Sequence, residues 1–201
     1  RVLFRSLYAL GVRQFAISAE GLPLIDPGRL PEANILQVES PVKLLQQLAA
    51  HHRAAASIPV IGITGSNGKT TVKEWLYEVL SPEHSIIKSP GSYNSQIGVP
   101  LSVWPIRAGH TLGIFEAGIS GSGEMDALRE VIQPTIGIFT NLLAAHDEGF
   151  VSREEKAAEK AKLFTGVEKV VHCADDPIVS AALTGLPVFT WGKDESNDVC
   201  I

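Results

Sequence analysis

The chain has 201 residues and a formal net charge of -5. Hydrophobic residues make up 45% of the chain, which is enough for a buried core. With 19% charged residues and a negative net charge, the chain lacks the basic character typical of proteins that bind nucleic acids or anionic membranes. Aromatic residues make up only 6%, which argues against a surface that stacks on nucleic-acid bases. The two cysteines, Cys173 and Cys200, lie outside any CxxC pair, which excludes a disulfide framework or a zinc knuckle and favours a cytoplasmic location.

The first part of the chain predicts a small α/β unit. Its expected elements are a helix over 3–11, strands over 13–18 and 34–38, and a helix over 40–56. The segment 19–33 carries two glycines and three prolines and is expected to be a loop. The unit is too short for a complete domain, and Arg1 stands where a Met would begin a protein, so we expect a fragment of a longer chain.

From residue 58 onward, apolar runs alternate with helical patterns. Strands are expected over 58–63, 84–88, 111–115, 135–140, 167–172 and 187–190, and helices over 71–80, 97–104, 124–132, 152–164 and 177–183. Such alternation predicts an α/β fold with a mostly parallel sheet and helices on both faces. Ligands of these sheets bind beyond the carboxyl ends of the strands, so the segments that follow the strands are where functional residues are expected.

The stretch IPVIGITGSNGKTTVKEWL joins the first of these strands to the first helix. Gly65 and Gly68 permit a tight turn that exposes backbone N–H groups, Lys69 can place a charge on phosphates, and Thr70 offers a hydroxyl to Mg²⁺. The spacing differs from G-x-x-x-x-G-K-[ST], because Ile63 stands where the first glycine belongs. A glycine-rich turn without a ligand is the alternative, but GKTT between a strand and a helix favours phosphate binding.

Polar residues also follow two later strands. Glu116 ends the run TLGIFE, where a carboxylate beside a phosphate loop suits Mg²⁺, although a solvated glutamate in a turn is the alternative. His146 lies in the loop after IFTN, and a lone histidine is more often structural than a ligand. Ser152 and Glu155 predict a capping box for the next helix, whose lysines by spacing alone form a solvated, salt-bridged face.

The loop TGSNGKTT resembles the ATP loop TG[ST]xGKT[ST] of the Mur ligase family, the ATP-dependent amide-bond ligases of peptidoglycan synthesis. The resemblance continues in the same order through SPGSYNSQIGVPLSV, IFEAG, TNLLAAHDEGF and AEKAKLF, and covers most of residues 34–192. SPGSYNSQIGVPLSV is similar to a segment of the branch that adds D-alanyl-D-alanine, with Ser95 in place of a common Asn. In TNLLAAHDEGF, Asp147 stands where many relatives have Leu.

The resemblance implies a set of site residues. ATP would contact Thr64, Gly65, Ser66, Asn67, Gly68, Lys69, Thr70 and Thr71. Thr70 and Glu116 would hold one Mg²⁺, while His146 and Lys160 would support a second, with Lys160 carbamylated and therefore negatively charged. Lys69, His146 and Lys160 would be the catalytic residues, and Asn94 would face the muropeptide substrate. Carbamylation needs a neutral amine, which burial of a lysine near other cations favours.

The same resemblance implies the domain organisation and the reaction. Residues 1–56 would be the end of an N-terminal UDP-sugar-binding domain, residues 57–201 an incomplete central ATPase domain of the P-loop type, and the C-terminal ligase domain would be absent. The parent protein would use ATP and Mg²⁺ to add D-alanyl-D-alanine to UDP-N-acetylmuramoyl-tripeptide through an acyl phosphate. A fused alanine racemase domain is a further partner found in some bacteria, and the fragment alone would be inactive.

Two other functions stay open on the sequence. A ligase like the folylpolyglutamate synthases shares the loop, although the segment GVPLSV argues against it. A nucleotide-binding module without ligase chemistry is the second alternative, although Glu116, His146 and Lys160 occurring together argue against it. A kinase or GTPase fits less well, because the loop spacing differs and no base-specificity motif is present.

Overall fold

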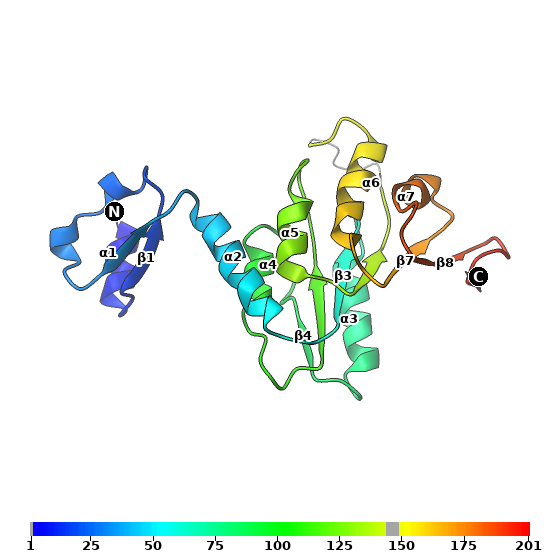
Figure 1. Ribbon diagram of the computed structural model, residues 1–201, viewed down its shortest axis with the longest axis horizontal. Coiled ribbons are helices and arrows are strands. Elements are labelled where there is room, and N and C mark those ends of the chain that lie inside the picture. The colour runs from blue at the N-terminus through cyan, green and yellow to red at the C-terminus, as the bar shows by residue number, and fades with distance from the viewer. Residues whose placement is uncertain (1, 144–148) are drawn as a thin grey trace. The chain divides into compact units, whose positions relative to one another are not determined.

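A computed structural model describes residues 2–143 and 149–201 of the chain. The chain divides into two compact units, Arg1–Gln47 and Leu48–Ile201 (Figure 1). The division falls inside one helix, whereas the sequence suggested a domain boundary at the end of that helix, after residue 56. None of the described helices is both long enough and apolar enough to span a bilayer.

The first unit is built on two short parallel strands. Helix α1 (Val2–Ala9) precedes β1 (Gln14–Ile17), which pairs with β2 (Asn34–Gln37). The connection between the strands is irregular apart from two short 3-10 turns, as its glycines and prolines predict. Helix α2 (Pro41–Ala54) then leads into the second unit.

The C-terminal half of α2 belongs to the second unit because of Arg53. This side chain is buried, and its guanidinium donates to the backbone oxygens of Ala56, Ile58, Ile132 and Gln133. Ile132 ends helix α5, and Gln133 follows it with a left-handed φ of 47°. A cation therefore satisfies carbonyls at a helix C-terminus, where both hydrogen bonding and the helix dipole favour it.

The second unit contains a seven-stranded parallel sheet in the order β4-β5-β3-β6-β7-β8-β9. The strands are β3 (Val60–Thr64), β4 (Ile86–Lys88), β5 (Leu112–Glu116), β6 (Ile136–Phe139), β7 (Lys169–Cys173), β8 (Val188–Gly192) and β9 (Val199–Cys200). The helices are α3 (Lys69–Leu80), α4 (Gly98–Val103), α5 (Met125–Ile132), α6 (Arg153–Ala161) with a 3-10 turn over Lys162–Phe164, and α7 (Pro177–Ala182). The predicted α/β fold with a mostly parallel sheet is confirmed.

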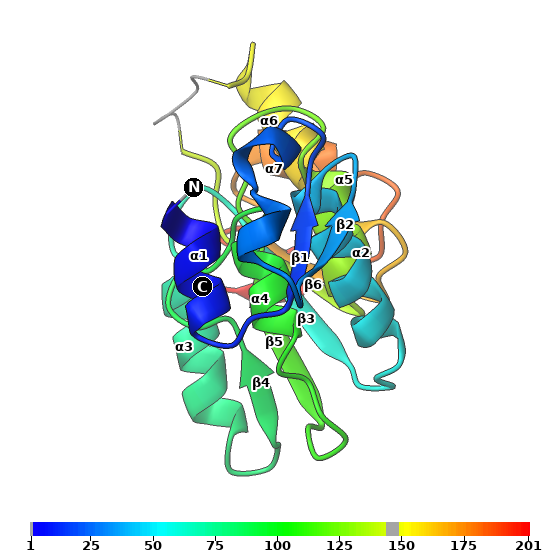
Figure 2. The same cartoon turned by 90° about the vertical axis from the view of Figure 1, so that its left-hand side faces the viewer.

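Helices cover both faces of this sheet, and strand alternation decides which residue faces which helix. Ile61 and Ile63 of β3 pack with Ile114 of β5 against α3. Phe115 of β5 points the other way, into the larger core with α4, α5 and α6. In Figure 2, α3 and α5 lie on opposite sides of the central strands. By the same period of two, Glu116 lies on the α3 face, directly after Phe115.

Glycines in the central strands let the connections after α5 and α6 approach the sheet closely. A Cβ added to Gly137 would lie 2.3 Å from the ring of Phe164, and one added to Gly62 would lie 2.9 Å from Pro134. Gly62 and Gly137 are partners in the β3–β6 register. The two positions therefore accept Phe164 and Pro134 because they carry no side chain.

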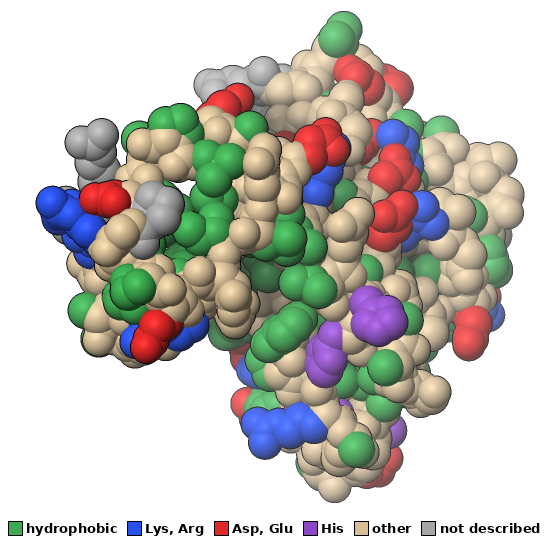
Figure 3. Space-filling view, turned by 60° about the vertical axis from the view of Figure 1, so that its left-hand side comes forward, with side chains coloured by type: hydrophobic (Ala, Val, Ile, Leu, Met, Phe, Trp, Pro, Cys, Tyr) green, Lys and Arg blue, Asp and Glu red, His purple; other side chains and the backbone are tan. Residues whose placement is uncertain are grey.

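The surface carries mixed charges. On the face shown in Figure 3, acidic and basic side chains are interspersed with apolar ones. The carboxyl ends of β3, β5 and β6 meet at one edge of the sheet, since Ile63 pairs with Glu116 and Thr64 pairs with Phe139. This edge is where the predicted site residues gather.

Candidate functional site

The loop after β3 needs its glycines for geometric reasons. Gly65 has a φ of 139°, and a Cβ there would lie 2.0 Å from the hydroxyl of Thr140. Gly68 caps α3 with a left-handed φ of 80°, a conformation that residues with a side chain rarely adopt. Lys69 and Thr70 then form the first turn of α3, so the N-terminal end of this helix opens toward the loop. Backbone N–H groups and the helix dipole make such an end attractive to anions.

The segment after β6 holds this loop in place. The N–H groups of Ser66 and Asn67 donate to the backbone and side-chain oxygens of Asn141, at 2.8 and 3.0 Å. Thr140 donates its hydroxyl to Asn67 O at 2.6 Å, and Leu143 N donates to Ser66 Oγ at 3.1 Å. Asn141 was not predicted as a site residue, although its place directly after an apolar strand was a signal that could have singled it out.

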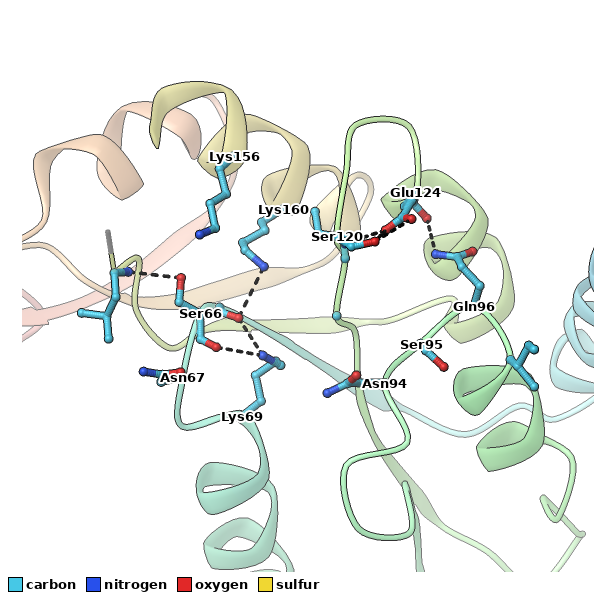
Figure 4. Close-up of a pocket in the computed structure, with 15 residues that line it drawn as sticks. Ser66, Asn67, Lys69, Asn94, Ser95, Gln96, Ser120, Glu124, Lys156 and Lys160 are labelled. Carbon is cyan, nitrogen blue, oxygen red and sulfur yellow. Dashed lines mark hydrogen bonds between the residues drawn. The ribbon is translucent and has the colours of Figure 1, made fainter. Parts of the chain in front are cut away.

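Three lysines converge on one side of the loop. Lys69 and Lys160 both donate to the carbonyl oxygen of Gly65, at 2.8 and 3.4 Å. Figure 4 shows Lys156 and Lys160 reaching down from α6 while Lys69 reaches up from α3. Lys156 and Lys160 are both buried. Lys156 was not predicted, because a lysine on a charged helix usually lies on its solvated face.

This convergence changes the acid–base behaviour of two of the lysines. Burial lowers the pKa of Lys160 to about 8, with smaller contributions from the charges of Lys69 and Lys156. Burial also lowers the pKa of Lys69. The negative charge of Glu116 opposes this lowering, whereas the positive charge of Lys156 adds to it. Lys160 therefore has a substantial neutral fraction near neutral pH, which is the form of an amine that reacts with carbon dioxide.

Glu116 sits fully buried at the end of β5. Thr70 donates its hydroxyl to Glu116 Oε2 at 3.0 Å, and Lys73 Nζ lies 2.8 Å from Glu116 Oε1. Oε1 is buried and accepts no aligned hydrogen bond within the described part of the chain. A buried carboxylate next to a threonine hydroxyl and a phosphate loop fits Mg²⁺, which takes one or two carboxylates and completes its shell with phosphate oxygens and water.

No denser metal site competes with this one in the described ranges, where no three or more His, Cys, Asp or Glu side chains lie close enough together to hold an ion. His146, which was predicted to support the second Mg²⁺, lies outside the described residues. Its position relative to Lys160 therefore stays a prediction.

The phosphate loop and the three lysines line a pocket of about 550 Å³, a size typical of small-molecule sites (Figure 4). It is lined by Gly65, Ser66, Asn67, Lys69, Asn94, Ser95, Gln96, Ile97, Gly118, Ile119, Ser120, Glu124, Leu143, Lys156 and Lys160. The loop of 65–69 forms one wall, and the segment of 94–97 forms the opposite wall. The structure thus brings Asn94 into the same pocket as Lys69 and Lys160.

Asn94 is fixed by its neighbours at the end of β5. Its backbone oxygen accepts from Gly118 N at 2.8 Å. A Cβ added to Gly118 would lie 2.8 Å from Asn94 Oδ1, so the glycine leaves room for the amide. The residues at the end of β5 therefore contact both sides of the pocket: Glu116 lies beside the phosphate loop, and Gly118 leaves room for Asn94.

Two of the predicted ATP-binding residues lie differently from the others. Thr64 is fully buried and donates its hydroxyl to Ala117 O at 2.9 Å, so its side chain links β3 to the end of β5. Thr71 is exposed in the first turn of α3. Of the predicted loop residues, Gly65, Ser66, Asn67 and Lys69 line the pocket.

The arrangement can bind and activate an anionic substrate. The loop N–H groups, the helix end and the lysines provide positive charge for phosphates, and Glu116 with Thr70 can hold a cation that bridges them. The opposite wall can position a second molecule next to the phosphates. Such positioning with charge neutralisation is the main requirement for phosphoryl transfer.

Comparison with known proteins gives the family. A family model described as the Mur ligase middle domain matches residues 63–200. A UDP-N-acetylmuramoyl-tripeptide--D-alanyl-D-alanine ligase from Mycobacterium tuberculosis is 33% identical over 198 residues, which are 94% of this chain and 39% of that protein. The chain spans well under half of the length of the curated relatives that it matches.

Solved structures agree. The crystal structure of the MurF ligase from Thermotoga maritima in complex with ADP aligns with a TM-score of 0.77 and 27% identity, over 93% of this chain and 49% of that one. Escherichia coli FolC in complex with DHPP and ADP aligns with a TM-score of 0.58 and 15% identity, over 75% of this chain and 46% of that one, which shows a shared fold alone. The family model covers more than half of the chain, and the chain therefore belongs to the Mur ligase family.

Proposed function

We propose that the protein containing this chain is an ATP-dependent ligase that adds D-alanyl-D-alanine to UDP-N-acetylmuramoyl-tripeptide in peptidoglycan precursor synthesis. The observation that carries the proposal is the single pocket into which the phosphate loop, Lys160 and the Asn94 segment all project. A reaction between a nucleotide and a second substrate needs one wall that binds the phosphates and a facing wall that holds the second substrate. The named function of the curated relatives supports the choice of substrates.

The proposed reaction has two steps. A carboxylate oxygen of the tripeptide attacks the γ-phosphorus of ATP, so that a carbon-bound oxygen gains the phosphoryl group and ADP leaves. The amine of D-alanyl-D-alanine then attacks the activated carbonyl carbon, an amide bond forms, and phosphate leaves with the electrons of the broken C–O bond. Asn94 faces the muropeptide, and the loop residues Gly65 to Thr70 hold the phosphates of the nucleotide in line with the attacking oxygen.

Lys69 and the cation sites neutralise the charge that builds up on the transferred group. Thr70 and Glu116 would hold one Mg²⁺, and His146 with carbamylated Lys160 would support a second. Bound Mg²⁺ draws charge from the phosphate oxygens and so lowers the barrier to phosphoryl transfer. Carbamylation would replace the cation of Lys160 by an anion, which the nearby charges of Lys69 and Lys156 and a bound metal ion would stabilise.

The domain assignment follows from the same proposal. Residues 1–56 would be the end of the N-terminal UDP-sugar-binding domain, and residues 57–201 part of the central ATPase domain. The C-terminal ligase domain would lie outside this chain, so we expect the 201 residues alone to lack ligase activity. A cytoplasmic location and a fused alanine racemase domain stay predictions from the sequence.

The test compares turnover in three variants of the full-length protein. Lys69→Ala should abolish formation of the amide product, and Glu116→Gln should lower the rate by about 10²–10³, the usual effect of removing one electrostatic partner of a transition state. Lys169→Met is the matched control, because Lys169 is an exposed lysine at the start of β7, outside the residues that line the pocket, and should behave as wild type. Near-wild-type turnover in Lys69→Ala would overturn the loop assignment.

A further inference from the structure

Lys73 is a fully buried lysine that the proposed mechanism does not use. It lies on α3, one turn after Lys69 and three residues after Thr70. Burying an ammonium group is strongly unfavourable unless partners replace its water. The groups that contact Lys73 therefore indicate its role.

Those partners lie on β5, on the turn that leads to Asn94, and on α3 itself. Lys73 Nζ lies 2.8 Å from Glu116 Oε1, while the other oxygen of the same carboxylate accepts from the Thr70 hydroxyl. The same ammonium donates to Ser89 O at 2.8 Å and to Gly91 O. A second carboxylate, that of half-exposed Glu74, lies 3.2 Å away.

The carbonyl groups of Ser89 and Gly91 belong to the turn that leads to Asn94. This turn is also tied to β5, because Glu116 N donates to Ser89 Oγ at 3.2 Å and Ser89 N donates to Ile114 O at 3.1 Å. Lys73 is thus the ammonium group through which α3, Glu116 and the start of the Asn94 segment are joined.

We propose that Lys73 is a positioning residue that sets two things at once: the orientation of the Glu116 carboxylate toward Mg²⁺, and the position of the segment that presents Asn94 to the muropeptide. The inference rests on the proposed function. Lys73 touches neither wall of the pocket directly and acts through Glu116 and the turn.

The two connections predict separable effects. Without Lys73, Glu116 loses the charge that opposes it and can rotate away from the side of Thr70, so Mg²⁺ should bind less tightly. Residues that orient a metal ligand typically contribute 10–100-fold in metal affinity, roughly the range expected here. The turn at 89–91 would also lose its donor, so the KM for the muropeptide should rise independently of the nucleotide.

The experiment uses the full-length protein with Lys73→Met, Lys73→Arg and the control Lys169→Met. Calorimetry measures ADP binding with and without Mg²⁺, and steady-state kinetics separates kcat from the KM for UDP-N-acetylmuramoyl-tripeptide. For Lys73→Met we expect metal-free ADP to bind as in wild type, the gain in affinity from Mg²⁺ to shrink about 10–100-fold, and the KM to rise. Lys73→Arg should recover part of both effects, because it keeps the charge.

A double variant keeps the inference testable if Lys73→Met folds poorly. Lys73→Met with Glu116→Gln removes both charges, which avoids leaving an unpaired buried carboxylate. We expect its Mg²⁺ effect on ADP binding to equal that of Glu116→Gln alone, while its KM for the muropeptide is higher. Purely additive losses of Mg²⁺ affinity would contradict the inference.

A lowered melting temperature in Lys73→Met, with Mg²⁺-dependent ADP binding and KM both unchanged, would overturn the inference in favour of a structural role. The binding measurement does not need ligase turnover. An inactive wild-type protein would therefore refute the proposed function, while the Mg²⁺ measurement would still decide whether Lys73 orients Glu116.

Discussion

Carbamylation of Lys160 should depend on pH in a way that an ordinary lysine does not. Its pKa is lowered from 10.5 to about 8, first by burial and then by the charges of Lys69 and Lys156. Carbon dioxide reacts only with the neutral amine. Lowering the pH below 8 therefore removes the reactive form, and raising it above 8 adds little more.

The size of the effect follows from the two pKa values. At pH 7 about one Lys160 amine in eleven would be neutral, against about one in three thousand for a lysine at 10.5. Lys160 should then carbamylate about 300-fold faster at pH 7 than a surface lysine of equal intrinsic reactivity. Between pH 6 and pH 7 the rate should rise about tenfold, and between pH 9 and pH 10 it should be nearly constant.

The assay is carbon-13 NMR of the nucleotide-free full-length protein with labelled bicarbonate, at a fixed concentration of dissolved carbon dioxide. Lys160→Ala identifies the carbamate signal, because only that signal should disappear. Lys156→Met removes one of the charges that lower the pKa of Lys160 and should move the midpoint of the rate profile to higher pH.

Two results would refute the reasoning. One is a profile whose midpoint lies near 10.5, which would mean that burial and the neighbouring lysines do not lower the pKa of Lys160. The other is the absence of a carbamate that Lys160→Ala removes, at any pH, which would exclude the proposed modification.

Three further predictions concern activity and packing. Lys160→Ala should lose activity that short carboxylic acids partly restore in a turnover assay, because they can replace the carbamate, and no rescue at any concentration would count against that role. Gly137→Ala should lower the free energy of unfolding in denaturant titrations by about 1–3 kcal/mol, since its Cβ would meet the ring of Phe164, while Gly109→Ala, in open space, should not; equal effects would contradict the packing argument. Ser152→Ala should lower the free energy of unfolding by about 1 kcal/mol, because Ser152 Oγ accepts a hydrogen bond from Glu155 N at 3.1 Å at the start of α6. An unchanged denaturation midpoint would show that this cap does not stabilise the helix.

The sequence predicted the sheet and most helices because their signals are local. Apolar runs of four to six residues punctuated by Gly, Pro and Asn identify buried parallel strands, and β3, β5 and β6 lie within two residues of their expected positions. Ser152 was predicted as a cap from its spacing to Glu155, and the hydrogen bond is present. A strand as short as β9, which has two residues, carries too little of this pattern to be identified.

The parts that sequence reasoning missed depend on contacts between distant segments. Lys73 and Lys156 lie on helices in which charged residues are common, and only the tertiary structure shows that both are buried. Asn141 gains its role from pairing with a loop 74 residues away. Conversely, Thr64 was grouped with the ATP loop by its position, whereas its hydroxyl bonds Ala117 O in the sheet.

Phosphate release by the full-length protein tests the central proposal most directly. ATP and Mg²⁺ would be supplied with UDP-N-acetylmuramoyl-tripeptide and D-alanyl-D-alanine, and each substrate would then be omitted in turn. We expect release only when both are present. Release with a folate and glutamate instead would place the protein with the folylpolyglutamate synthases, and ATP binding without release under any pair would contradict the ligase and indicate a nucleotide-binding module.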